Sequence, residues 1–72
     1  MRYVVYEQYE AYGRGRVFEE VWGFDSMDEA WYGLCLLYGW GLRGCIRDGL
    51  GNEWTISQCP DDVYSRFADY IN

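Results

Sequence analysis

Paired carboxylates are the first candidates for chemistry in this chain of 72 residues. Glu19-Glu20 and Asp61-Asp62 have the residue type that general acid–base catalysis uses. Adjacent residues on a strand point to opposite faces, however, and adjacent residues on a helix diverge. Neither pair therefore converges on one substrate atom, and the spacing argues against a two-carboxylate enzyme.

The second candidates are three cysteines, Cys35, Cys45 and Cys59. A cysteine or serine nucleophile needs a base, usually histidine, and the chain contains neither histidine nor lysine. An odd number of cysteines without a CxxC motif also argues against a disulfide framework and a tetrahedral zinc site. We expect reduced, mostly buried thiols, no enzyme activity and no cofactor. A Cys45–Cys59 bridge across a hairpin is left as an open alternative.

Nucleic-acid binding is the third possibility that the residue types raise. Two GxG sequences, Gly13-Arg14-Gly15 and Gly39-Trp40-Gly41, lack the third glycine and the strand–helix context of a phosphate-binding loop. Arginines near aromatic residues can stack on single-stranded nucleic acid. Twelve acids against six bases, however, give a net charge of −6, and phosphate neutralisation supplies most of the affinity for nucleic acid. We expect no direct nucleic-acid contact.

The acidic balance instead favours a basic protein partner. Tyrosine provides contact area at low entropic cost, and carboxylates steer a basic surface toward the site. The candidate partner-binding residues are Glu7, Tyr9, Glu10, Glu19, Glu20, Asp28 and Glu29. The alternative is that these acids only keep a tyrosine-rich chain soluble. For Asp28, Glu29 and Asp61-Asp62, helix capping is the favoured interpretation.

Length and composition limit how these residues are held. The length predicts a single domain over residues 1–72, near the lower limit of size for a domain that folds alone. A domain of this size buries only about 60% of the surface that its unfolded chain exposes. Its 15 aromatic residues, each able to bury roughly 150–250 Å², would supply much of the core. The chain has no run of about 18 apolar residues, and MRYVVYEQ lacks the apolar region of a signal peptide. We expect a soluble cytoplasmic protein without membrane contact.

A first hairpin is predicted from residues 2–12 and 16–24, joined by Gly13-Arg14-Gly15. A two- or three-residue loop would each give a different register. The preferred three-residue loop places Tyr6 opposite Trp22, and Val4 opposite Phe24, in the core. Four residues then share the outer face, namely Glu7, Tyr9, Glu19 and Val21.

A hairpin followed by a helix is predicted twice along the chain. Ser26-Met27-Asp28-Glu29 has the form of a capping box, and apolar residues recur at helical spacing up to Tyr38, before Gly39 and Gly41 end the helix. Gly33 within this helix indicates a close approach of backbone. Residues 42–57 predict a second hairpin between Cys45-Ile46 and Trp54-Ile56, and Pro60 opens a last helix. The apolar face of this helix comprises Val63, Tyr64, Phe67, Ala68 and Ile71.

The predicted fold is therefore α+β: a four-stranded antiparallel sheet with two helices on one face, in the order ββαββα. In size, acidity, absence of catalytic motifs and hairpin–helix order, the chain resembles the small acidic proteins that bacteriophages encode against host defences, anti-CRISPR proteins above all. This resemblance implies a stoichiometric inhibitor in the cytoplasm of a bacterial host. Its partner would be a basic host protein or nucleoprotein complex such as a CRISPR effector, whose nucleic-acid-binding surface it covers. The alternative function is a small homo-oligomerising structural or accessory protein, in which an aromatic sheet face meets its own copy.

Overall fold

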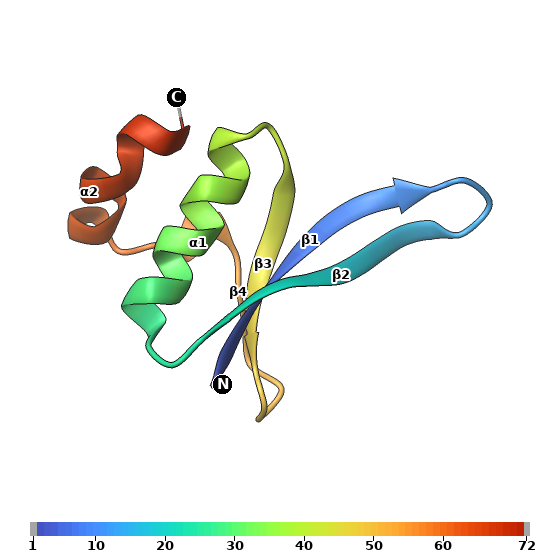
Figure 1. Cartoon of the computed structure of the whole chain (residues 1–72), viewed down its shortest axis with the longest axis horizontal. Coiled ribbons are helices and arrows are strands. Elements are labelled where there is room, and N and C mark those ends of the chain that lie inside the picture. The colour runs from blue at the N-terminus through green and yellow to red at the C-terminus, as the bar shows by residue number, and fades with distance from the viewer. Residues whose placement is uncertain (1, 72) are drawn as a thin grey trace.

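The computed structural model describes the backbone of residues 2–71 and the side chains of residues 2–69. It is an α+β structure with a four-stranded antiparallel sheet and two helices (Figure 1). The strands lie in the order β2-β1-β3-β4. In chain order the elements are β1 (Tyr3–Ala11), β2 (Gly15–Phe24), α1 (Met27–Gly39), β3 (Arg43–Asp48), β4 (Glu53–Trp54), the 3-10 helix η1 (Ile56–Gln58) and α2 (Asp61–Ile71).

The predicted order of elements is confirmed only in part, because η1 intervenes before α2. The second hairpin was expected to extend to Ile56, but β4 ends at Trp54. The Gln58 side chain accepts a hydrogen bond from the Thr55 amide at 2.9 Å, and the Gln58 amide donates to the Thr55 carbonyl at 3.0 Å. These two hydrogen bonds close a helical turn. Continued pairing with β3 would have needed extended backbone at these residues, so β4 ends before them.

Both ends of α1 follow local sequence signals. The Ser26 hydroxyl oxygen accepts from the Glu29 amide at 3.2 Å, as predicted. The Glu29 carboxylate accepts from the Ser26 hydroxyl at 2.9 Å, and not from the Ser26 amide as in a full capping box. At the other end Gly41 has a φ of 83°, and the Leu42 amide donates to the Leu37 carbonyl at 3.1 Å. This left-handed glycine ends the helix as expected.

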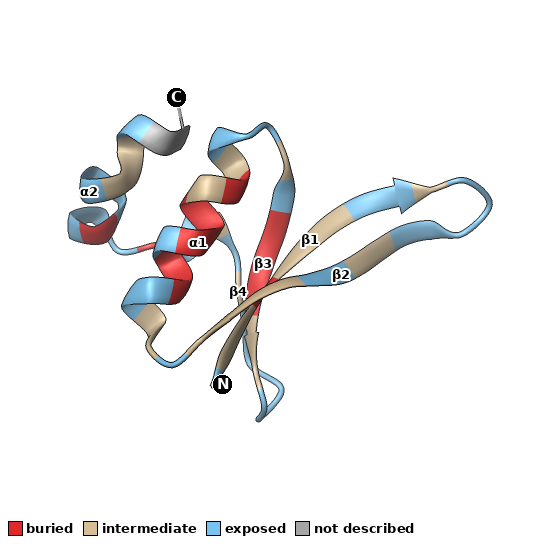
Figure 2. Ribbon diagram, in the orientation of Figure 1, coloured by how far each residue is buried: buried red, intermediate tan, exposed pale blue. Residues whose placement is uncertain are grey.

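The core lies between α1 and the sheet. Leu34 and Leu37 of α1 are fully buried against Val5 of β1 and Ile46 of β3 (Figure 2). A Cβ on Gly33 would lie 2.7 Å from a ring carbon of Phe24. The close contact predicted at this glycine therefore exists, but the neighbouring group is an aromatic ring and not a backbone segment.

The second helix packs along the side of α1 (Figure 1). Val63 is buried in the core, and the Phe67 ring lies 5.2 Å from the Tyr32 ring, centroid to centroid. Tyr64, predicted on the apolar face, is exposed instead, because it is turned by about 100° around the helix from the buried Val63. The side chain of Ile71 lies outside the described residues.

The register predicted for the first hairpin is wrong. Val5 pairs with Trp22, and Tyr6 pairs with Glu20, because a bulge leaves Val21 without a partner on β1. The loop also begins one residue earlier than expected: the Arg14 amide donates to the Ala11 carbonyl at 2.9 Å. Gly13 supplies the positive φ, 76°, that a type II turn requires at its third residue.

This register reverses the predicted faces of β1. Val5 is fully buried under α1, so the residues two and four positions further, Glu7 and Tyr9, lie on the same, helix-covered side of the sheet. Glu19, paired with Glu7, lies on that side too. Their placement on the outer face was wrong, although the prediction that they share a face is correct.

The far half of the hairpin nevertheless projects beyond both helices (Figures 1 and 2). Pairing between β1 and β3 ends at Gln8 opposite Arg43. Beyond that point β1 has only β2 beside it. Tyr9 is 39% exposed and Tyr12, in the loop, is fully exposed. Side chains on both faces of this segment therefore meet solvent.

Candidate partner-binding site

We call the segment from Glu7 to Glu20 the hairpin arm. Strand β3 still flanks Glu7 and Gln8, and the part from Tyr9 to Val17 projects beyond it. Glu7 on β1 pairs directly with Glu19 on β2, and both side chains lie on the same face. Glu7 is half-buried and Glu19 is exposed. The ion pairs among the described residues, Arg47–Glu53 and Arg66–Asp28, involve neither carboxylate. Two like charges thus face each other without a cation between them.

The same face carries a tyrosine next to this carboxylate pair. Tyr9 follows Glu7 by two positions on β1 and pairs with Val17 of β2. Because side chains alternate along a strand, Tyr9 and Val17 extend the face that begins with Glu7 and Glu19. The result is a strip of two carboxylates, one phenol and one branched apolar side chain, which begins beside Gly44 of β3 and extends past the end of that strand.

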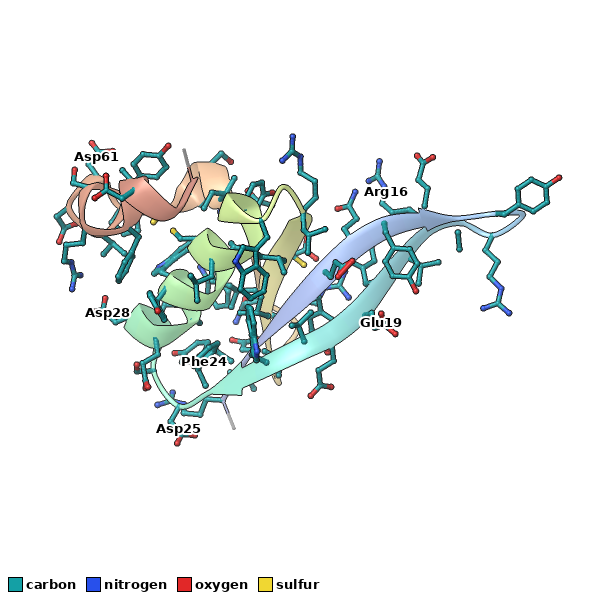
Figure 3. The ribbon with its side chains drawn as sticks, turned by 45° about the horizontal axis from the view of Figure 1, so that its top comes forward. Arg16, Glu19, Phe24, Asp25, Asp28 and Asp61 are labelled. Carbon is teal, nitrogen blue, oxygen red and sulfur yellow. The ribbon has the colours of Figure 1, made fainter. Side chains whose placement is uncertain are left out.

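The opposite face of the arm has a different charge balance. Glu10 pairs with Arg16, and Glu20 pairs with Tyr6. Arg16 and Glu19 project from opposite sides of the hairpin (Figure 3). The five hairpin residues predicted to bind a partner are therefore divided between two faces: Glu7, Tyr9 and Glu19 on one, Glu10 and Glu20 on the other.

Asp28 and Glu29 do not belong to this site. They lie in the first turn of α1, far along the molecule from the hairpin arm (Figure 3). Asp28 accepts from Arg66 of α2 at 3.3 Å, and Glu29 caps its own helix through Ser26. Both carboxylates thus have partners inside the fold: Glu29 takes part in the helix cap, as interpreted, whereas Asp28 forms an ion pair with another helix.

The sheet face opposite α1 holds a cluster that the sequence analysis did not predict. The Arg47 guanidinium lies 4.3 Å from the ring centroid of Phe18 and 5.1 Å from that of Tyr6. Its Nε donates to the Glu53 carboxylate at 2.7 Å. This hydrogen bond lowers the pKa of Glu53 from its ordinary value. An arginine therefore covers the rings on this face, and the face offers a partner less bare aromatic surface than expected.

The three cysteines are free and buried, as predicted. Cys45 lies beside Glu53 on the Arg47 side of the sheet, whereas Cys59 lies in the core beside Cys35 of α1, so the Cys45–Cys59 bridge is not formed. Burial and the neighbouring Cys59 raise the pKa of Cys35 to about 11. Burial and then Glu53 raise the pKa of Cys45. Raised thiol pKa values oppose formation of the reactive thiolate.

A depression of about 360 Å³ lies beside the β3–β4 turn. The Asp48 carboxylate beside it accepts three hydrogen bonds from its own turn, from the Leu50 amide and from the backbone and side chain of Asn52. The Asn52 side chain is the main cause of the lowered pKa of Asp48. The carboxylate is thus committed to the turn. The depression is lined by Arg2, Tyr3, Asp48, Gly49 and Leu50.

The described part of the chain has neither a metal-binding cluster nor a membrane-spanning helix. No cluster of three or more His, Cys, Asp or Glu side chains there could hold a metal ion. None of the helices in that part has the length and apolar character needed to cross a membrane. Comparisons of the chain with protein-family models, with curated proteins and with solved structures gave no match.

Proposed function

We propose that this chain is a small binding protein that presents its hairpin arm to a basic protein surface. We further propose that it is an inhibitor of the anti-CRISPR kind, which covers the lysines and arginines with which a host defence complex holds nucleic acid. The observation that carries the proposal is the pairing of Glu7 with Glu19, at the base of the projecting hairpin, with no ion pair to either carboxylate among the described residues.

The energetics of this pair favour binding of a cation. Like charges directly opposite each other destabilise an antiparallel ladder. A lysine or arginine of a partner placed between Glu7 and Glu19 would remove the repulsion and form charge-assisted hydrogen bonds. The half-buried position of Glu7 strengthens this interaction, because water screens it less than it screens a fully exposed charge.

The neighbouring residues define where a partner would sit. Arg14 and Arg16 lie near the loop, so the end of the arm is not acidic. The uncompensated carboxylates, Glu7 and Glu19, lie in the middle of the hairpin, and Tyr9 beside them adds amphipathic contact area. The middle of the arm, rather than its loop, is therefore the contact region that we propose.

The test is competition for nucleic acid. Guide-loaded CRISPR effectors of several types would be incubated with labelled target DNA and increasing amounts of the protein. The proposal expects displacement of DNA from at least one effector, weakening as ionic strength rises. If a large excess displaces DNA from none of them, the inhibitor function is refuted.

Two matched charge-reversal substitutions distinguish binding through the hairpin arm from a general effect of the negative net charge. Glu19→Arg creates an attractive pair with Glu7, so it should raise stability by roughly 0.2–1 kcal/mol while abolishing displacement. Asp69→Arg makes the same change of charge on the exposed surface of α2 and should leave displacement intact. Equal losses from both substitutions would show that net charge, and not the hairpin arm, is responsible.

A further inference from the structure

Strand β2 forms a long, free edge of the sheet. It has β1 on one side and no strand on the other, and it runs for ten residues. The other edge strand, β4, has only two residues. A long edge presents unpaired backbone groups to which another strand can bind, and short strands and bulges limit this tendency. On β2 the bulge at Val21 leaves a regular edge from Gly15 to Glu20.

Symmetry restricts how this edge can pair with a second copy of itself. Two identical antiparallel edges that join into one sheet are related by a two-fold axis perpendicular to the sheet. Residues that lie opposite each other across this axis therefore point to the same face of the sheet. Arg16, Phe18 and Glu20 share a face of β2. Pairing centred on Phe18 places Arg16 of each copy opposite Glu20 of the other.

The other symmetric registers are less favourable. If the two-fold axis passes through Glu19 or Glu20, two carboxylates lie directly opposite each other. If it passes through Arg16, two guanidinium groups lie opposite each other. Centring on Val17 leaves Arg16 opposite a phenylalanine ring. A shift by one residue would bring opposite faces together, which the two-fold axis forbids. Charge thus selects the register centred on Phe18.

The charge pattern of this edge points to a two-fold dimer, which we propose forms by antiparallel pairing of β2 with β2 of a second copy of this chain, centred on Phe18. Arg47 does not block this contact, because β3 lies on the other side of β1 and its arginine reaches Phe18 across the sheet face. The dimer does not depend on the proposed function, since Glu7, Tyr9 and Glu19 lie on the opposite face from the two ion pairs.

The experiment combines two charge reversals. Sedimentation equilibrium of the full chain, up to millimolar concentration, should show a monomer–dimer equilibrium. Arg16→Glu and Glu20→Arg should each weaken it by about tenfold or more, because two attractive pairs become two repulsive ones. An equimolar mixture of the two variants should restore the dimer, because the mixed pairing again places opposite charges across the axis. Far-UV circular dichroism would establish that both variants are folded.

One control substitution and three possible outcomes test the proposed dimer. Arg14→Glu makes the same change of charge in the loop, outside the proposed register, and should leave the dimer unchanged. A wild-type chain that stays monomeric at millimolar concentration overturns the proposal. So does a dimer that Arg16→Glu and Glu20→Arg leave intact, since the contact then lies elsewhere. Separate monomeric variants whose mixture fails to dimerise also contradict it.

Discussion

The two halves of the first hairpin are made from the same pair of strands but have opposite surroundings. Near the chain start, Val5 is fully buried and Trp22 and Phe24 pack against the core below α1. In the hairpin arm, the same strands continue past the end of β3, and from Tyr9 onward they lie beyond the helices, where both faces meet solvent (Figure 2). The difference therefore comes from the length of α1, which covers only part of the sheet.

The treatment of charge differs between these regions in the same way. Near the helices and the second hairpin, Asp28 is paired with Arg66 and Glu53 with Arg47. In the hairpin arm, Glu7 and Glu19 face each other with no cation. Carboxylates near the helices and the second hairpin thus have cationic partners, whereas the arm contains a local repulsion. A cost in stability of this kind is common where a surface serves binding.

The largest contrast should come from removing side-chain volume in each region. Leu34→Ala opens a cavity in the fully buried contact between α1 and the sheet and should lower the free energy of unfolding by about 3 kcal/mol. Tyr12→Ala, in the exposed loop of the arm, should change it by less than about 0.5 kcal/mol. Urea denaturation measures both. A loss of similar size at Tyr12 would show that the arm is packed and not projecting.

The next effect tests the point where the covered sheet becomes the arm. Gly44 of β3 pairs with Glu7, and a Cβ there would overlap the Tyr6 carbonyl and the Leu37 side chain. Gly44→Ala should therefore destabilise the protein by about 2 kcal/mol, because backbone and helix must both shift.

Gly49→Ala is the matched control for this substitution, since a Cβ at that position has no atom within 4 Å. It should be almost neutral in the same thermal or urea unfolding assay. If both alanines are tolerated equally, the tight contact between β3, β1 and α1 does not limit stability.

Local sequence signals were sufficient to predict the helix that covers the sheet. Ser26, Glu29 and Gly41 act through backbone groups within a few residues, so their roles were evident from spacing alone. The register of the first hairpin was not evident in this way. It depends on where the loop begins, since Gly13 and Gly15 both have a positive φ, and on a bulge at Val21, which lets Val5 meet Trp22. The bulge lets Trp22 and Phe24 pack with the core under α1, which is a long-range contact without a local sequence signal.

The sequence predicted correctly which hairpin residues of the candidate site share a face, but not which face of the sheet they lie on. The predicted and observed registers of the arm differ by two residues, which preserves the side-chain alternation, so Glu7, Tyr9 and Glu19 share a face in both. The bulge then reverses which face of β1 lies under the helix. The contact of Arg47 with Phe18 is a long-range consequence of the sheet order and had no local signal.

A smaller effect should distinguish the two faces of the hairpin arm by sign. Glu7→Gln or Glu19→Gln removes the repulsion between facing carboxylates and should raise the free energy of unfolding by roughly 0.2–1 kcal/mol. Glu10→Gln removes an attraction to the facing Arg16 and should lower it by a similar amount. Thermal unfolding at low ionic strength measures both. Equal signs for the two substitutions would contradict the register described above.

The smallest effect concerns acid stability outside the arm. The Arg47 hydrogen bond holds the pKa of Glu53 below its ordinary value, so this pair contributes stability above the unfolded-state pKa and loses it as the pH falls through the lower, folded-state pKa. Because both side chains are partly exposed, the contribution is only a few tenths of a kcal/mol. Glu53→Gln should therefore be slightly less stable than wild type near neutral pH and should lose less stability between about pH 5 and pH 3. Thermal unfolding of both proteins across this range provides the comparison. Parallel pH profiles would mean that the Arg47–Glu53 pair does not stabilise the sheet face opposite α1, and that its rings are held by packing alone.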